Sequence, residues 1–161
     1  MSDPDAVEIL LVEDNPADVE LTLLALGQNK LANKIQVARD GEEALDFLFN
    51  RGSFRDRKSQ APPRIVLLDL KLPKVDGLAV LRAAKGDPRT RAIPIVVLTS
   101  SKEEKDMVES YSLGVNSYIQ KPVNFDNFRQ TVRDLGLYWL LVNVPPPQSA
   151  FVGAARDSND L

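Results

Sequence analysis

The sequence of 161 residues contains no histidine and no cysteine. Without histidine, the chain cannot be a histidine kinase or a histidine phosphotransfer protein, and it cannot form a Ser-His-Asp triad or a histidine-ligated metal site. Without cysteine, it has no disulfide, no thiolate metal site and no cysteine nucleophile, which fits a reducing compartment. Any chemistry must therefore use carboxylates, hydroxyls and amines.

Long apolar runs and an excess of positive charge are missing as well. No run approaches the roughly 20 residues of a membrane span. The segment from Met1 to Glu8 carries three acids in place of the apolar core of a secretory signal. A net charge of -3 provides no strongly basic face for nucleic acid. We therefore expect a cytoplasmic protein with no membrane and no nucleic-acid partner.

Short apolar runs alternate with longer amphipathic segments along the chain. The runs cover residues 7–12, 34–38, 64–69, 93–99 and 116–120. Within the third run, Ile65 to Leu68 are apolar at every position, which is typical of a parallel strand buried on both faces. The alternation predicts an α/β fold with a doubly wound, five-stranded parallel sheet. The length leaves no room for a second folded output domain.

Local signals predict where some helices begin. Asn15-Pro16 offers a cap followed by proline at the first helical position, and Ser101 with Glu104 forms a possible capping box for a helix that runs toward Leu113. The polar segment 50–63 contains four arginines or lysines, and it is longer than a usual connection. It is either an exposed contact surface or a mobile loop.

Polar residues follow the predicted strands at their carboxyl ends. Glu13 and Asp14 follow the first strand, Asp69 the third and Lys121 the fifth, while Thr99 ends the fourth. In an open parallel sheet, ligands bind at this edge near the switch point of strand order. Each residue alone has a structural explanation, such as helix capping or solvation. Together, three carboxylates would raise one another's pKa unless a cation balanced them, and Mg²⁺ is a hard cation that takes oxygen ligands.

This arrangement suits phosphoryl transfer. A carboxylate such as Asp69 can act as the nucleophile. The transition state spreads negative charge over three oxygens, and the pattern offers one partner for each of them. Mg²⁺ would balance the first, the ammonium of Lys121 the second and the hydroxyl of Thr99 the third.

The motifs resemble those of the response-regulator receiver family of two-component signalling. The resemblance covers residues 7–123 and implies a flavodoxin-like fold with strand order 2-1-3-4-5. It implies that a sensor histidine kinase phosphorylates Asp69, and that the chain is no enzyme beyond self-directed phosphotransfer and dephosphorylation. The matching motifs are Glu13-Asp14, Asp69 within Leu67 to Pro73, Asp76-Gly77 at the turn before the third helix, Thr99-Ser100 and Lys121-Pro122.

The resemblance also implies roles for individual residues. After phosphorylation, the hydroxyl of Thr99 moves toward the phosphoryl group and Tyr118 turns inward, which alters the surface made by the fourth helix, fifth strand and fifth helix. The alternative interpretation is that Tyr118 is simply a half-buried aromatic residue of the strand. The implied magnesium ligands are Asp14, Asp69 and the backbone carbonyl of Lys71, with Glu13 acting mainly through water.

Apolar residues continue beyond the last predicted strand at spacings of three and four. One such stripe is enough to dock a helix, and further apolar residues remain for another surface. We expect residues 1–123 to form the strands and first four helices, 124–144 the fifth helix and a homodimer surface, and 145–161 a flexible tail. The stripe is Phe125, Phe128, Val132, Leu135, Trp139 and Val142, and the further residues are Leu137, Tyr138, Leu140 and Leu141.

The long basic loop and this C-terminal region resemble the single-domain regulators of phytochrome-type kinases. That resemblance implies a bacteriophytochrome as the kinase partner and dimerisation through the C-terminal region.

Two other functions fit part of the pattern. A phosphatase of the haloacid-dehalogenase type also uses an aspartate nucleophile and Mg²⁺, but it needs a second acid two residues later, where this chain has Lys71. A constitutive pseudo-receiver would bind partners without phosphorylation, although every phosphorylation residue is present here. The glycine-rich phosphate loops of nucleotide-binding folds are missing after the first predicted strand.

Overall fold

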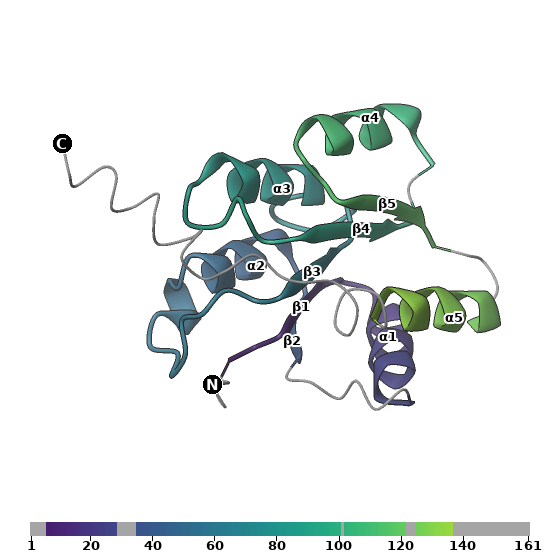
Figure 1. The fold of residues 1–161 in the computed structure, drawn as a ribbon, viewed down its shortest axis with the longest axis horizontal. Helices are drawn as coiled ribbons and strands as arrows, with labels where there is room; N and C mark the ends of the chain where they lie inside the picture. Colours follow the sequence, from purple (N-terminus) through teal and green to yellow (C-terminus); the bar gives the residue numbers. More distant parts are fainter. Residues whose placement is uncertain (1–5, 29–34, 101, 122–124, 137–161) are drawn as a thin grey trace.

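The computed structural model describes residues 6–28, 35–100, 102–121 and 125–136 of the chain. Strands and helices alternate within them, and each strand lies inside one of the predicted apolar runs (Figure 1). The strands are β1 (Ile9–Val12), β2 (Ile35–Ala38), β3 (Ile65–Leu68), β4 (Ile95–Thr99) and β5 (Ser117–Gln120). The helices are α1 (Pro16–Gln28), α2 (Gly41–Leu48), the short 3-10 helix η1 (Gly52–Phe54), α3 (Gly77–Gly86), α4 (Glu104–Ser112) and α5 (Phe125–Gly136).

The strands form one parallel sheet in the order β2-β1-β3-β4-β5, which confirms the predicted fold class. The strand order reverses between β1 and β3, and this switch point is where open α/β sheets place their ligand sites. The register pairs Val12 of β1 with Leu68 of β3. Glu13 and Asp69 therefore leave two neighbouring strands at the same level of the sheet.

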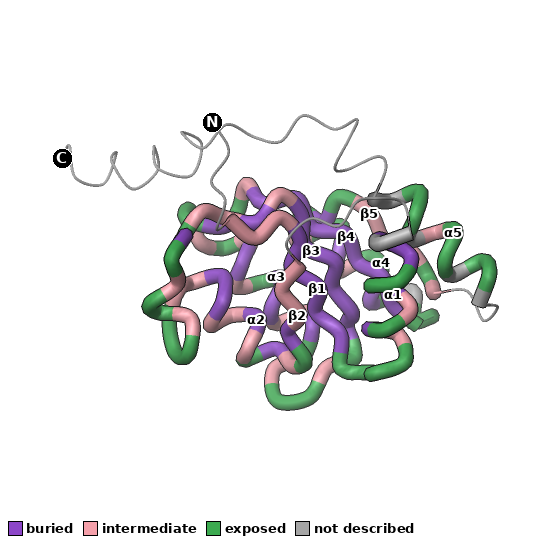
Figure 2. Tube along the Cα trace, turned by 90° about the horizontal axis from the view of Figure 1, so that it is seen from below, coloured by how far each residue is buried: buried purple, intermediate pink, exposed green. Residues whose placement is uncertain are grey.

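Alternate residues of the central strands belong to two separate core clusters, and Figure 2 colours these strands as buried. Leu10 and Leu68 belong to a cluster with Phe47 of α2 and with residues of α3. Leu11 and Leu67 belong to a second cluster with residues of α1, and α5 lies against α1 (Figure 1). The central strands are thus buried on both faces, as their unbroken apolar sequence predicted.

The start of α1 agrees with the predicted cap, whereas the start of α4 does not. The side-chain Oδ1 of Asn15 accepts hydrogen bonds from the backbone N–H groups of Ala17 at 2.9 Å and Asp18 at 3.2 Å. Helix α4 begins at Glu104, with Glu103 at the N-cap position. The predicted capping box required Ser101 as the N-cap, two residues before the observed cap, so the predicted start of this helix was wrong. Ser101 itself lies outside the described residues.

The turn before α3 packs tightly against the segment that carries Asp69. Asp76 caps α3 by accepting a hydrogen bond from the N–H of Ala79 at 2.9 Å. Gly77 comes so close that an added Cβ would lie 2.3 Å from the carbonyl oxygen of Asp69 and 2.4 Å from the Cα of Leu70. The Asp76-Gly77 turn predicted from the sequence is therefore confirmed, and close packing fixes the backbone at Asp69.

The long basic segment is anchored to the domain. The guanidinium of Arg57 lies 3.9 Å from the centre of the Phe47 ring and donates to the Oδ1 of Asn50 at 2.6 Å. The ring of Phe54 meets Phe47 edge to face at 5.2 Å. These contacts tie the segment to the core cluster on the α2 face.

Helix α5 is the predicted fifth helix. The side chains of the predicted apolar stripe and residues 137–161, including most of the expected dimer surface and the tail, lie outside the described part of the structure. In the part that is described, no helix is both long and apolar enough to span a membrane.

Candidate functional site

The carboxyl edge of the sheet brings together the strand-end residues predicted from the sequence. Backbone hydrogen bonds align these ends, because the N–H of Asp69 donates to Val12 at 3.0 Å and the N–H of Lys121 donates to Thr99 at 2.8 Å. Asp69, Glu13 and Thr99 are buried, with 5%, 3% and 0% of their surface exposed. Asp14, by contrast, is exposed, so the site combines an exposed carboxylate with ionisable groups held in the protein interior.

Both oxygens of Asp69 accept hydrogen bonds. The hydroxyl of Thr99 donates to Oδ1 at 2.6 Å, and the backbone N–H of Lys71 donates to the same atom at 3.3 Å. The ammonium of Lys121 donates to Oδ2 at 3.3 Å. A buried carboxylate needs such partners to remain charged, and these three lie where they could also contact a group bonded to Asp69.

The ammonium of Lys121 is shared among three acids. Besides Asp69, it donates to a carboxylate oxygen of Glu13 and to Oδ2 of Asp18 at 2.7 Å. Burial alone would lower the pKa of Lys121, but the hydrogen bonds to Asp18 and Glu13 and the charge of Asp69 raise it above its ordinary value. Lys121 is thus a permanent cation at this edge.

Three carboxylates form a group that can hold a cation. One oxygen from each of Glu13, Asp14 and Asp69 lies within 4.8 Å of the others. Burial raises the pKa of Glu13 to about 7, although the hydrogen bond from Lys121 opposes the rise; the charge of Asp69 adds to it. The single ammonium of Lys121 faces the carboxylates of Glu13, Asp18 and Asp69, with Asp14 close by, and an oxygen-lined site with more carboxylates than cations fits a hard divalent cation.

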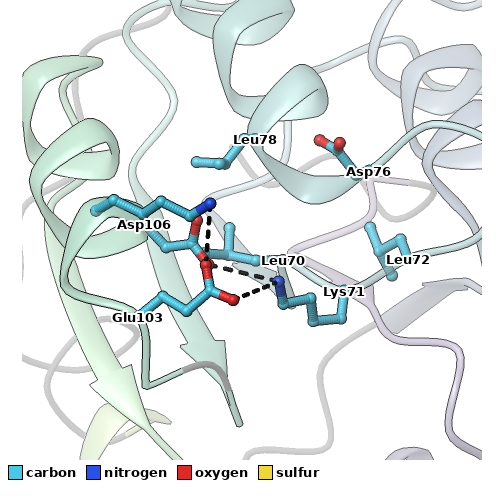
Figure 3. A pocket seen from close by; sticks show the side chains of 8 residues that line it. Leu70, Lys71, Leu72, Asp76, Leu78, Glu103 and Asp106 are labelled. Atoms are coloured by element: carbon cyan, nitrogen blue, oxygen red, sulfur yellow. Dashed lines mark ion pairs between the residues drawn. The ribbon is translucent and has the colours of Figure 1, made fainter.

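Lys71, the fourth predicted metal residue, lies beside this group. Its backbone N–H contacts Asp69, while its side chain points away to the start of α4, with Nζ 3.8 Å from Glu103 and 3.6 Å from Asp106 (Figure 3). These side chains border a pocket of about 420 Å³, which is also lined by Leu70, the residue after Asp69. The predicted role of the Lys71 carbonyl oxygen as a metal ligand stays a prediction.

Tyr118 lies on the edge strand β5, away from the acidic group. It is half-buried, packs against the core cluster on the α4 side of the sheet, and borders a second pocket together with Met107 of α4 and Gln120. This position suits either role considered from the sequence, a switch residue or a half-buried strand aromatic.

Asp18 is the site residue that the strand-end pattern missed. It lies in the first turn of α1, and 25% of its side chain is exposed. The available sequence signal was an acid one turn into a helix that starts directly after the acidic strand end. Acids are common at helix N-termini because they interact favourably with the helix dipole, so this signal alone did not distinguish Asp18.

A doubly wound five-stranded sheet that brings these side chains to one edge defines a receiver-type α/β domain. The chain belongs to the response regulator receiver domain family, whose model matches residues 9–133.

Relatives of similar length support this assignment. The probable methanogenesis regulatory protein FilR2 of Methanothrix harundinacea is 44% identical, over 88% of this chain and 89% of the relative. The Mn²⁺-bound form of the response regulator Rcp1, a protein of Synechocystis, has a TM-score of 0.82 at 37% identity, covering 88% of this chain and 99% of the other. The bacteriophytochrome response regulator AtBRR has a TM-score of 0.69 at 56% identity, covering 88% of this chain and all 100% of the other.

Proposed function

We propose that this chain is a single-domain response regulator that accepts a phosphoryl group on Asp69 from a sensor histidine kinase. The observation that carries the proposal is the environment of Asp69. Its buried carboxylate contacts a hydroxyl, a backbone N–H and an ammonium, and it lies beside two further acids at the switch point of the sheet.

The transfer is a displacement at phosphorus. A carboxylate oxygen of Asp69 forms the new P–O bond as the P–N bond to the kinase histidine breaks, and the imidazole nitrogen keeps the electron pair and takes up a proton. Lys121 stabilises charge on one phosphoryl oxygen, and the hydroxyl of Thr99 donates to another. Since this chain has no histidine, the donor must lie on another protein.

Mg²⁺ is the cofactor we propose for this reaction. Asp14, Asp69 and the backbone carbonyl of Lys71 would hold the ion directly, and Glu13 would hold it mainly through water. When bound, the ion would neutralise charge on the phosphoryl group. The geometry supports this assignment, because one carboxylate oxygen from each of Glu13, Asp14 and Asp69 lies within 4.8 Å of the others.

The output is a change of a protein-binding surface. The hydroxyl of Thr99 would move from Asp69 to the phosphoryl group, and Tyr118 would turn inward from its half-buried position on β5. Helix α4, beside this strand, exposes Val108 and Tyr111, which gives the switch an apolar surface to modify.

The relatives favour a bacteriophytochrome-type kinase as the donor, because AtBRR is a bacteriophytochrome response regulator. FilR2 shows that chains of this similarity also occur in another regulatory context. We further propose a cytoplasmic location and a homodimer through α5 and residues 135–144.

A phosphatase and a constitutive binding module are the alternatives. The phosphatase requires an acid two residues after the nucleophile, and Lys71 at that position is held in ion pairs with Glu103 and Asp106. A constitutive module would have no need of a buried aspartate surrounded by donors. The environment of Asp69 therefore favours phosphoryl acceptance over both.

The test is the intact mass of the protein after incubation with acetyl phosphate. Wild type should gain one phosphoryl group when Mg²⁺ is present and none in EDTA, and Asp69→Asn should gain none. Asp56→Asn is the matched control, since the Asp56 side chain is 92% exposed, and it should label like wild type. Equal labelling of wild type and Asp69→Asn would exclude Asp69 as the acceptor. Transfer from a purified phosphorylated bacteriophytochrome then tests the partner.

A further inference from the structure

Lys121 donates a hydrogen bond to one acid, Asp18, that is neither the proposed acceptor nor a member of the cation-binding group. The group of acids that could hold a cation consists of Glu13, Asp14 and Asp69. Asp18 comes from α1, yet its Oδ2 lies 2.7 Å from the Lys121 ammonium, closer than the 3.3 Å between that ammonium and Asp69.

The contacts of Lys121 match its hydrogen-bonding capacity. A lysine ammonium has three N–H donors and no acceptor. Three carboxylates, from Glu13, Asp18 and Asp69, each accept from Lys121. If a phosphoryl oxygen replaces the carboxylate of Asp69 as one acceptor, the other two acids can keep the ammonium in place.

Asp18 is well placed to hold this lysine. Its backbone N–H is fixed by the Asn15 cap at 3.2 Å, so the carboxylate projects from the first, ordered turn of α1. Among the described residues, the Asp18 carboxylate accepts its hydrogen bond from Lys121, and it does not cap the N-terminus of α1. Lys121, by contrast, follows the half-buried edge strand β5 and has a long, flexible side chain that loses rotamer entropy when it is fixed.

We infer that Asp18 is a positioning residue for phosphoryl transfer to Asp69, acting by orienting the ammonium of Lys121. The inference rests on the function proposed above. A preorganised cation stabilises developing charge without reorganising during the reaction. Without Asp18, the ammonium would spread over more positions between Glu13 and Asp69 and would meet the phosphoryl oxygen less often in the productive geometry.

The experiment is a double-mutant cycle on the rate of Asp69 labelling by saturating acetyl phosphate with Mg²⁺. In the wild-type background, Asp18→Ala should slow labelling roughly tenfold, the low end of the range for residues that orient a functional group. In the Lys121→Ala background, the same substitution should change the rate by less than about twofold, because there is no ammonium left to orient. Asp18→Glu should recover part of the rate, since it keeps the charge.

Glu20→Gln is the matched control, because Glu20 is an exposed acid on the same helix, and it should label at the wild-type rate. A slowing by Asp18→Ala that is equal in both backgrounds, or no slowing in either, would overturn the inference. If circular dichroism shows Asp18→Ala to be unfolded, Asp18→Asn replaces it in the cycle, with a smaller expected slowing and the same criterion. Failure of wild type to label at all would refute the proposed function instead, so the two failures can be told apart.

Discussion

Replacement of Lys121 by methionine should destabilise the domain, and the site shows by how much. The side chains of Lys121, Glu13 and Asp69 are 8%, 4% and 6% exposed, and Asp18 is 25% exposed. At an effective dielectric constant of about 20, one pair of charges about 3 Å apart attracts by roughly 5 kcal/mol, and desolvation offsets most of this gain. Removing one partner leaves the others buried and unpaired, which typically costs about 3 to 5 kcal/mol. We expect Lys121→Met to lose that amount.

The loss should depend on pH through Glu13. Burial raises the folded-state pKa of this carboxyl from 4.5 to about 7, despite the hydrogen bond from Lys121. A carboxyl with a raised folded-state pKa binds its proton more tightly in the folded protein, so it lowers stability increasingly as the pH rises from about 4.5 to about 7 and by a constant amount above that. Without Lys121 this pKa should rise further. The deficit of Lys121→Met should therefore be larger near pH 8.5 than near pH 6.

Urea unfolding followed by circular dichroism measures the effect at both pH values, in EDTA and with Mg²⁺. Added Mg²⁺ should recover more stability in the variant than in wild type, because it supplies the missing positive charge; about 2.7 kcal/mol is available at 100 times the dissociation constant. The control is Lys105→Met, whose side chain is 81% exposed and which should stay within about 0.5 kcal/mol of wild type. If Lys121→Met in EDTA near pH 8.5 unfolds at the wild-type urea concentration, the assigned electrostatic role is wrong.

Three further outcomes are expected. Thr99→Ala should still be labelled on Asp69 but should lose much of the conformational response, seen as a smaller phosphorylation-dependent change in Tyr118 fluorescence or NMR shifts. Thr99→Ser keeps the hydroxyl and should respond. A full response by Thr99→Ala would contradict the proposed coupling between Thr99 and Tyr118. Gly77→Ala should lower the free energy of unfolding by several kcal/mol and impair labelling, because its Cβ would meet backbone at 2.3 Å. Gly86→Ala, at the other end of α3, meets nothing within 4 Å and should be neutral or slightly stabilising. Similar melting temperatures for the two variants would refute this reasoning. Light scattering should find a dimer, either already without or only with a phosphoryl mimic, that is lost on truncation after Asp134. A full-length chain that stays monomeric at high concentration in both states would exclude the homodimer.

Much of the site could be predicted because a residue that directly follows a strand lies at a known edge of the sheet. Asp69 and Glu13 follow apolar strands that pair in register, so a correct sheet order was enough to bring them together. Thr99 and Lys121 follow the same logic on β4 and β5. The period of the apolar pattern determined the sheet, and the sheet determined the neighbours.

Helix-borne contacts were less accessible. Whether Asp18 reaches Lys121 depends on the direction of the first turn of α1 relative to β5, and strand alternation carries no information on that direction. The start of α4 was wrong for a related reason: a Ser-x-x-Glu pattern is short, and α4 begins instead with Glu103 at the cap. The anchoring of the basic segment by Arg57 on Phe47 joins residues whose pairing leaves no periodic signal.

The half-buried edge strand β5 gives the site an uneven mechanical support. The acceptor follows β3, which has strands on both sides and no exposed residue. Tyr118 lies on β5 and Lys121 directly follows it, and β5 is paired on one side and buried less completely. Local opening free energies follow such differences, so we expect the amide hydrogens of β5 to exchange with solvent through smaller fluctuations than those of β3. We therefore expect the acceptor end of β3 to stay fixed while Tyr118 on β5 moves at lower cost, so that a single added phosphoryl group can shift the edge of the domain without unfolding its centre.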